Sequence, residues 1–212
     1  MVNYAEAIKR PFTDLKKFLI GVVLGIIPIV NFFVGGYEIE CIRTVIKKGK
    51  KDYRLPEWTN WGNLFFRGFL SFVIGLIWII PLIVILLIAL GSAFVSLFSL
   101  ESAGVPAYNA IAGMGAWLIV LIIVALLIAY ISPMSMVFFA KDYKFGDAFK
   151  LGKILKKTFT GTYFMAWIIS IVISMVIMFV LSIIPFLGTM LSSFIVGVMM
   201  YTILGEVYSE TE

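Results

Sequence analysis

Long apolar runs separated by short polar stretches make up most of the chain. The hydrocarbon core of a bilayer is about 30 Å thick, so a helix needs about 20 apolar residues to cross it. Four runs are longer than that, and each carries at most one charged residue. They predict membrane-spanning helices over residues 64–98, 111–139, 161–184 and 186–208.

An earlier apolar stretch is interrupted by a proline. Residues 18–27 are apolar but would span only about 15 Å at helical rise, and Pro28 follows them. A helix restarting at Pro28 would run to Lys48 and stop before Gly49, because helices favour proline near their start and glycine just past their end. Residues 18–48 therefore predict a broken helical hairpin, whose first arm either crosses the membrane or turns back.

Two further prolines interrupt apolar runs in the same way. Pro81 and Pro185 each follow a pair of isoleucines. Proline lacks the backbone N–H and clashes with the preceding turn, so we expect a kink or break at each. Together with Pro28, they predict an all-α, polytopic integral membrane protein with about six membrane helices or half-helices.

The three prolines coincide with a candidate internal repeat. Each is preceded by a segment that opens with an aromatic residue, a small residue and an acid or amide: residues 4–8, 61–65 and 145–149. All three would begin on the same side of the membrane, so the repeat would be parallel. The alternative is coincidence in an isoleucine-rich chain, because the distance from each segment to its proline differs.

Two basic segments are predicted to lie along the membrane surface. Residues 1–17 form an amphipathic helix when placed at 100° per residue, with Arg10 on its polar face and Pro11 dividing it. Residues 141–157 form a second amphipathic basic segment. Helices of this kind lie in the headgroup layer with their apolar face toward the acyl chains.

The linker of residues 49–63 is rich in tryptophan. Trp58 and Trp61 lie three residues apart beside basic residues, a combination typical of the membrane–water interface. We therefore expect both to be interfacial anchors, just before the span that begins at residue 64.

The positive charges predict the orientation. All 17 Lys and Arg residues lie within residues 9–17, 43–67 or 141–157, and the loop of residues 99–109 has none. The positive-inside rule places the N-terminus and the basic segments in the cytoplasm and that loop outside. Counting crossings returns the C-terminus to the cytoplasm. We expect a multi-pass protein of the cell (plasma) membrane whose partners include anionic lipid headgroups.

Composition removes several classes of function. Of the 212 residues, 62% are hydrophobic and 14% charged, too few polar groups to cover a soluble globule, so we expect a single membrane domain over residues 1–212. Lipid headgroups explain the net charge of +5 without nucleic acid. The absence of histidine removes His-based catalysis and most zinc or haem sites, and Cys41 has no second cysteine to pair with. We expect no enzyme activity, no cofactor and no metal.

Glu38 is the most unusual polar residue within an apolar run. On a helix that starts near the outer surface at Pro28 it lies about 15 Å down, near the bilayer midplane. Ionisable groups at that depth usually face protein or water. Glu40, Arg43 and Asn31 on the same helix complete a candidate intramembrane polar site. The alternative is a tilted or re-entrant helix, with Glu38 near the headgroups and Glu40 paired with Arg43.

Small residues offer surfaces for close helix packing. Gly21 and Gly25 lie four residues apart on one helix face, a spacing that lets two helix backbones approach. Such a face serves either packing within the chain or contact with a second copy or another membrane protein. The sequence leaves both open.

Four stretches carry a resemblance to a known family: Ile27–Asn31, Leu55–Trp58, Trp61–Gly62 and Phe145–Phe149. They resemble the uncharacterised prokaryotic membrane family called domain of unknown function 4013, which is common in archaea. The resemblance covers nearly the whole chain and implies a multi-pass topology, but it brings no established activity. Family members usually carry more acid around the second tryptophan, where this chain has Thr59, Asn60 and Asn63. That departure argues against a carboxylate cation site there.

Two classes of function are consistent with these patterns. Proline-broken helices and a deep Glu38 favour a permease or channel-like protein for a small solute or ion. Three interfacial segments and few polar groups within the spans favour a non-catalytic membrane scaffold or accessory subunit. A water-accessible Glu38 would support the first class, and a dry or arginine-paired Glu38 the second.

Overall fold

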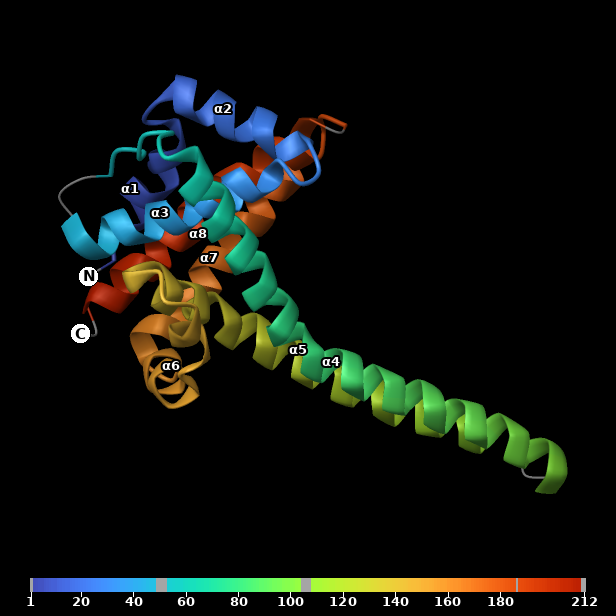
Figure 1. Ribbon diagram of the computed structural model, residues 1–212. Coiled ribbons are helices and arrows are strands. Elements are labelled where there is room, and N and C mark those ends of the chain that lie inside the picture. The colour runs from blue at the N-terminus through green and yellow to red at the C-terminus, as the bar shows by residue number, and fades with distance from the viewer. Residues whose placement is uncertain (1, 49–52, 104–107, 186, 211–212) are drawn as a thin grey trace. The chain divides into compact units, whose positions relative to one another are not determined.

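The computed structural model describes residues 2–48, 53–103, 108–185 and 187–210, and every regular element in those ranges is helical (Figure 1). The elements, in chain order, are α1 (Tyr4–Lys9), η1 (Arg10–Phe12), α2 (Leu15–Ile26), α3 (Asn31–Lys48), α4 (Trp61–Ala103), α5 (Tyr108–Asp142), η3 (Phe145–Phe149), α6 (Leu151–Thr158), α7 (Gly161–Leu181) and α8 (Leu187–Glu210).

Four of these helices are long and apolar enough to cross a bilayer, which confirms the predicted all-α membrane fold. The qualifying segments are Trp61–Val95, Gly115–Asp142, Gly161–Leu181 and Leu187–Glu210. Helix α2 has 12 residues, about 18 Å at helical rise, and is therefore too short to cross alone. With α3 it forms the broken hairpin that the sequence predicted.

The helices are interrupted at Pro28 and Pro185, as predicted. Helix α2 ends at Ile26, and α3 begins only at Asn31, three residues later than expected. The delay arises because Ile29 adopts a left-handed conformation with φ of 71°, which a helix does not accept. At the second site α7 ends at Leu181, ahead of Pro185, and α8 begins at Leu187.

At Pro81, where the sequence predicts a kink or a break, the helix does not break. Pro81 lies inside α4, which continues on both sides of it. A proline within a helix forfeits one backbone hydrogen bond and crowds the preceding turn. A complete break in hydrocarbon would leave several backbone groups without water or protein partners, which costs more than the one lost bond.

The candidate repeat is only partly present. Residues 4–8 lie in α1, residues 61–65 open α4, and residues 145–149 form η3, so each segment begins a helix at its aromatic residue. The break that follows is present at Pro28 and Pro185 but not at Pro81.

The predicted membrane domain divides into two compact units, one of residues 1–74 and 133–212 and one of residues 75–132. Within the described part of the first unit, α8 is the central helix and packs against α1, η1, α2, α3 and α7. Within the second unit, the described parts of α4 and α5 run side by side as a hairpin (Figure 1), and many of their apolar side chains are exposed.

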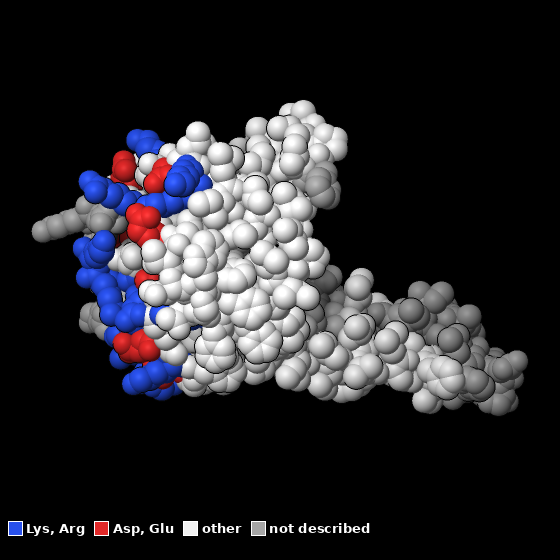
Figure 2. Space-filling model, turned by 45° about the horizontal axis from the view of Figure 1, so that its top comes forward, with Lys and Arg blue, Asp and Glu red and all other residues white. Residues whose placement is uncertain are grey.

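Charged side chains are segregated within the first unit. Figure 2 shows them gathered at one end, whereas the rest of that unit's visible face is uncharged. Lys47 and Lys48 close α3, and Lys156 and Lys157 lie in the last turn of α6. An uncharged belt beside a charged end is the distribution that a bilayer and its headgroups favour.

Arg10 corrects the assignment of the N-terminal helix. It was expected on the solvent-facing side, but its side chain is fully buried. Its guanidinium donates to the Cys41 carbonyl at 3.1 Å, to Thr202 Oγ1 at 2.7 Å and to Thr44 Oγ1 at 2.7 Å. The reason is tertiary packing: α1 and η1 pack against α8, and acceptors on α3 and α8 surround the guanidinium, so this side of the segment faces protein.

Helices α3 and α4 cross with their backbones in contact. A methyl group at Gly36 would overlap the Leu64 carbonyl, and one at Gly68 would overlap the Phe32 carbonyl. Both positions therefore require glycine. This crossing fixes the rotation of α3 and so determines where Glu38 points.

Candidate functional site

The Glu38 carboxylate lies against the backbone of α8. A methyl group at Gly197 would overlap Glu38 Oε1, so the carboxylate occupies the space that a side chain there would fill. The two helices run in the same direction, because Gly205 further along α8 lies beside Ile42 and Val45 further along α3. Glu38 is only partly buried, although it lies between packed helices, and it lines two cavities.

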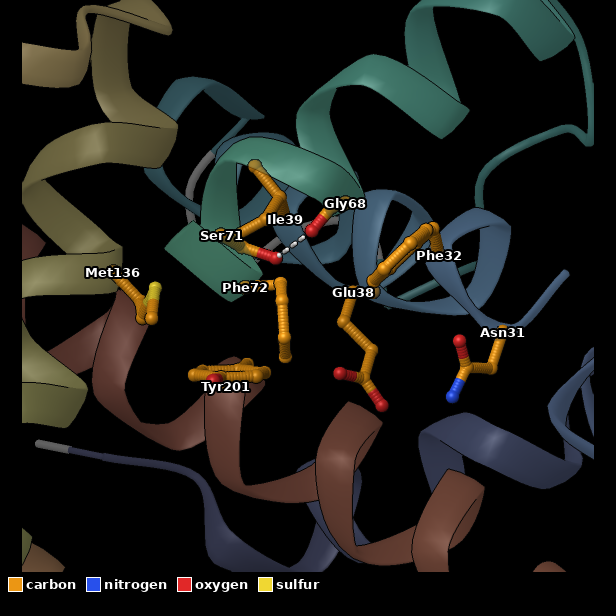
Figure 3. A pocket seen from close by; sticks show the side chains of 10 residues that line it. Asn31, Phe32, Glu38, Ile39, Gly68, Ser71, Phe72, Met136 and Tyr201 are labelled. Carbon is orange, nitrogen blue, oxygen red and sulfur yellow. Dashed lines mark hydrogen bonds between the residues drawn. The ribbon is translucent and has the colours of Figure 1, made fainter. Parts of the chain in front are cut away.

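The first cavity lies among α3, α4, α5 and α8 and has a volume of ≈ 230 Å³. Figure 3 shows Glu38 and Asn31 extending from α3 toward α8, with Tyr201 and Met136 on the other side of the space. Ser71 supplies a further polar group from α4. The cavity is therefore lined by one carboxylate, one amide and two hydroxyl groups, together with apolar side chains.

The second cavity lies at the junction of α3, α7 and α8 and has a volume of ≈ 630 Å³. Its serine and threonine residues come from the C-cap of α7 and the first turns of α8: Ser182, Thr189, Ser192 and Ser193. Glu38 lines this cavity as well. The break at Pro185 thus places a group of hydroxyls beside the deep carboxylate.

Glu38 and Tyr201 are common to both cavities. They come from the two helices that pack together, α3 and α8. Both side chains therefore contribute to the lining of each space.

Three hydroxyl groups of the two cavities donate their protons to backbone carbonyls. Ser71 donates to the Gly68 carbonyl at 2.8 Å (dashed in Figure 3). In the second cavity Ser182 donates to the Phe179 carbonyl at 2.7 Å, and Ser192 to the Thr189 carbonyl at 2.8 Å. A hydroxyl whose proton is committed still has oxygen lone pairs, so these groups present acceptors to the cavities.

Glu40 and Arg43 belong to a separate polar cluster. Glu40 forms an ion pair with Arg67 at 2.7 Å and accepts a hydrogen bond from the Tyr143 hydroxyl. The guanidinium carbons of Arg43 and Arg67 lie 4.0 and 3.5 Å from the centroid of the Tyr143 ring. The alternative in which Glu40 pairs with Arg43 is therefore replaced by a pair with Arg67, because the α3–α4 crossing brings that residue closer.

The remaining predicted candidates divide between lining and packing roles. Asn31 opens α3 and lines the first cavity. Trp58 is only 8% exposed and stacks on Tyr37 with ring centroids 3.9 Å apart. The assignment of Trp58 as an interfacial anchor is therefore corrected, because protein surrounds the side chain. Trp61 is 44% exposed and remains open to the surroundings.

Gly21 packs on Phe194 of α8, within the chain.

The segment before Trp58 is clamped to α2 through Lys17. The Lys17 ammonium pairs with Glu57 at 2.6 Å and donates to the Leu55 carbonyl at 3.0 Å, and Trp58 Nε1 donates to the Lys17 carbonyl at 3.1 Å. The hydrogen bond to Glu57 raises the pKa of the Lys17 ammonium. The backbone N–H of Lys17 donates to Asp14, which lowers the pKa of that carboxyl.

Sequence reasoning missed Tyr201 and the hydroxyls of the cavities. Serine and threonine are common in membrane helices as packing residues, so their type alone gives no signal. The available signal was spacing: Thr189, Ser192 and Ser193 follow Pro185 closely, where a break leaves backbone and side chains free to line a cavity.

The chain matches the family model described as "Protein of unknown function (DUF4013)" over residues 19–186. It therefore belongs to this family, as the four stretches predicted. None of the curated proteins and none of the solved structures matches it.

Proposed function

We propose that this protein conducts a small solute or ion across the membrane along a path on which Glu38 lies. The observation that carries the proposal is that one carboxylate, that of Glu38, lines two cavities among these helices. A side chain whose only role was packing would not need open space in either cavity. An ionisable group deep within membrane helices usually serves an ion, proton or substrate pathway.

Depth along the helices supports this proposal. Glu38 lies nine residues before Lys47 on α3, and Gly197 lies nine residues before Glu206 on α8. At helical rise each interval is about 14 Å, close to half the thickness of the hydrocarbon core. With Lys47 and Glu206 at the headgroups, Glu38 and Gly197 lie near the bilayer midplane. By the positive-inside rule we place the charged end of the first unit in the cytoplasm.

The two helix breaks also support a conduction path. Asn31 of the first cavity follows Pro28 by three residues, and Thr189 of the second follows Pro185 by four. Both breaks lie toward the ends of α3 and α8 opposite the charged end, and irregular backbone is tolerated in a membrane where it lines a cavity, as it does in transport sites built from discontinuous helices.

A reconstitution experiment tests the proposal. Purified protein in liposomes is assayed for flux over a panel of ions and small solutes, comparing the native chain with Glu38→Gln, which keeps the shape of the side chain and removes its charge. Glu6→Gln is the matched control, because Glu6 is a surface residue whose side chain is 42% exposed. We expect flux that Glu38→Gln abolishes and Glu6→Gln leaves unchanged.

No flux over the panel, with all three proteins folded, would contradict the proposal. That result would favour the alternative of a non-catalytic membrane scaffold or accessory subunit. Equal flux through the native chain and Glu38→Gln would also count against it, because the path would then not include Glu38.

A further inference from the structure

We infer that the species passing Glu38 is a small monovalent cation, coordinated by the carboxylate and by neutral oxygen atoms of the two cavities. This inference rests on the proposed function and specifies its substrate class. It follows from three properties of the cavity walls: the sign of their charge, the direction of their hydroxyl protons, and the number of their carboxylates.

The sign of the charge excludes an anion. Among the described residues that line the two cavities, Glu38 is the only acid, and none is Lys or Arg. The nearest described guanidinium groups of α3 and α4, those of Arg43 and Arg67, are engaged with Tyr143 and Glu40 away from these walls. An anion beside Glu38 would face an unpaired carboxylate in a region of low dielectric, where the repulsion between like charges is strongest.

The hydroxyl groups reinforce this preference. Ser71, Ser182 and Ser192 direct their protons to carbonyls of their own helices, so their oxygens meet the cavity as electron-pair donors. An anion site needs donor protons aimed into the cavity. Oxygen lone pairs facing inward are what a hard cation requires in place of its water ligands.

The number of carboxylates favours a single positive charge. Divalent calcium is typically held by several carboxylates within six to eight oxygen ligands, whereas one carboxylate is present here. Within the described ranges, no group of three or more His, Cys, Asp or Glu side chains could hold a metal ion. One monovalent cation neutralises Glu38, which removes much of the cost of a buried charge.

Ion selectivity provides the test. Liposomes containing the purified full chain are assayed with sodium or potassium, with calcium, with chloride, and with the large cation N-methylglucamine. We expect flux of sodium or potassium that exceeds that of calcium, chloride and N-methylglucamine. Glu38→Gln should lower it about tenfold or more, because an interaction with a charged ligand contributes at least that factor.

A serine pair tests the hydroxyl ligands separately. The double variant Ser182→Ala with Ser192→Ala should lower the cation flux severalfold. Ser209→Ala is the matched control: it lies on α8 and donates to the Gly205 carbonyl at 3.0 Å, but it lines neither cavity. All variants are checked for native folding by size-exclusion chromatography and thermal melting.

The possible results separate this inference from the proposed function. Glu38-dependent flux carried by chloride, by calcium, by a neutral solute or by protons alone would overturn the cation assignment and leave the path intact. Equal effects of the serine pair and of Ser209→Ala would overturn the role of the hydroxyl oxygens. If no tested species shows Glu38-dependent flux, the proposed function itself fails.

Discussion

The carboxylate of Glu38 occupies the space beside α8 that is free only because residue 197 is glycine. This contact joins α3, which carries Glu38, to α8, which carries Gly197. It also makes the position of the carboxylate sensitive to a single methyl group on the neighbouring helix, at a residue with no charge of its own.

Gly197→Ala should therefore reduce flux without removing the carboxylate. The added methyl would overlap Glu38 Oε1, so the Glu38 side chain must rotate away from residue 197. Overpacking of this kind costs about 1–3 kcal/mol. We expect a loss of flux comparable to that of Glu38→Gln. Gly205→Ala is the control on the same helix, because its methyl would meet its nearest neighbours at 3.4 Å. Equal flux through both variants would contradict this role for Gly197.

The α3–α4 crossing gives a prediction about stability. Gly36→Ala and Gly68→Ala would each place a methyl onto a backbone carbonyl, which cannot move without separating the helices. We expect each to destabilise the protein by about 1–3 kcal/mol or more, measured as a lower midpoint of thermal unfolding in detergent. Gly62→Ala, with nothing within 4 Å of the added methyl, should be neutral or slightly stabilising in its helix. A stable Gly36→Ala protein would show that the crossing is looser than described.

Arg10 should be essential for stability although it lies in a surface segment by sequence. Arg10→Lys keeps the charge but cannot reach the acceptors on α3 and α8 together. Each buried acceptor left without a donor costs about 1–3 kcal/mol, so we expect a marked fall in the unfolding midpoint. Lys9→Ala, whose side chain is 70% exposed, should change it little. Matching midpoints for the two variants would argue against the anchoring role.

The Lys17 clamp predicts a specific dependence on pH. The pKa of Lys17 is raised in the folded protein, so its contribution is complete below its unfolded value of about 10.5 and is lost as pH rises through the higher folded value. The pKa of Asp14 is lowered, so its contribution is complete above its unfolded value of about 3.8 and is lost as pH falls through the lower folded value.

Difference measurements isolate these two groups. The unfolding midpoint of the native chain minus that of Lys17→Gln should be constant at neutral pH and should shrink at alkaline pH above 10.5. The corresponding difference for Asp14→Asn should shrink only at acid pH below 3.8. Lys16→Gln, at an exposed position, serves as the control. A difference for Lys17→Gln that does not vary with pH would contradict the clamp.

Hydropathy and proline positions predicted much of the fold, because membrane length and backbone hydrogen bonding leave few choices. Breaks at Pro28 and Pro185 followed from that logic. The absence of a break at Pro81 did not follow from it, because a proline in the sequence does not show whether the turns on either side stay helical. Arg10 was misplaced because one sequence does not show that α3 and α8 cover this side of the N-terminal segment.

The candidate site was predicted only in part. Glu38 stood out because an acid in an apolar run is costly and therefore informative. Tyr201, Gly197 and the hydroxyl groups could not be assigned to it, because their role depends on which helices meet, and one sequence does not specify helix pairing. Glu40 and Arg43 share α3 with Glu38 but point to another cluster, which helical spacing alone could not decide.

The most direct test of the central claim is the accessibility of position 38 to water. Glu38→Cys is made in a Cys41→Ala background, which keeps the Cys41 backbone carbonyl that accepts from Arg10. Membrane-impermeant thiol reagents are then applied from each side. Ile42→Cys on the same helix, at a fully buried position, is the unlabelled control, and Lys9→Cys is the labelled one. Labelling at position 38 from at least one side is the predicted result. A folded protein labelled at position 9 but not at position 38 from either side would contradict a water-filled path past Glu38.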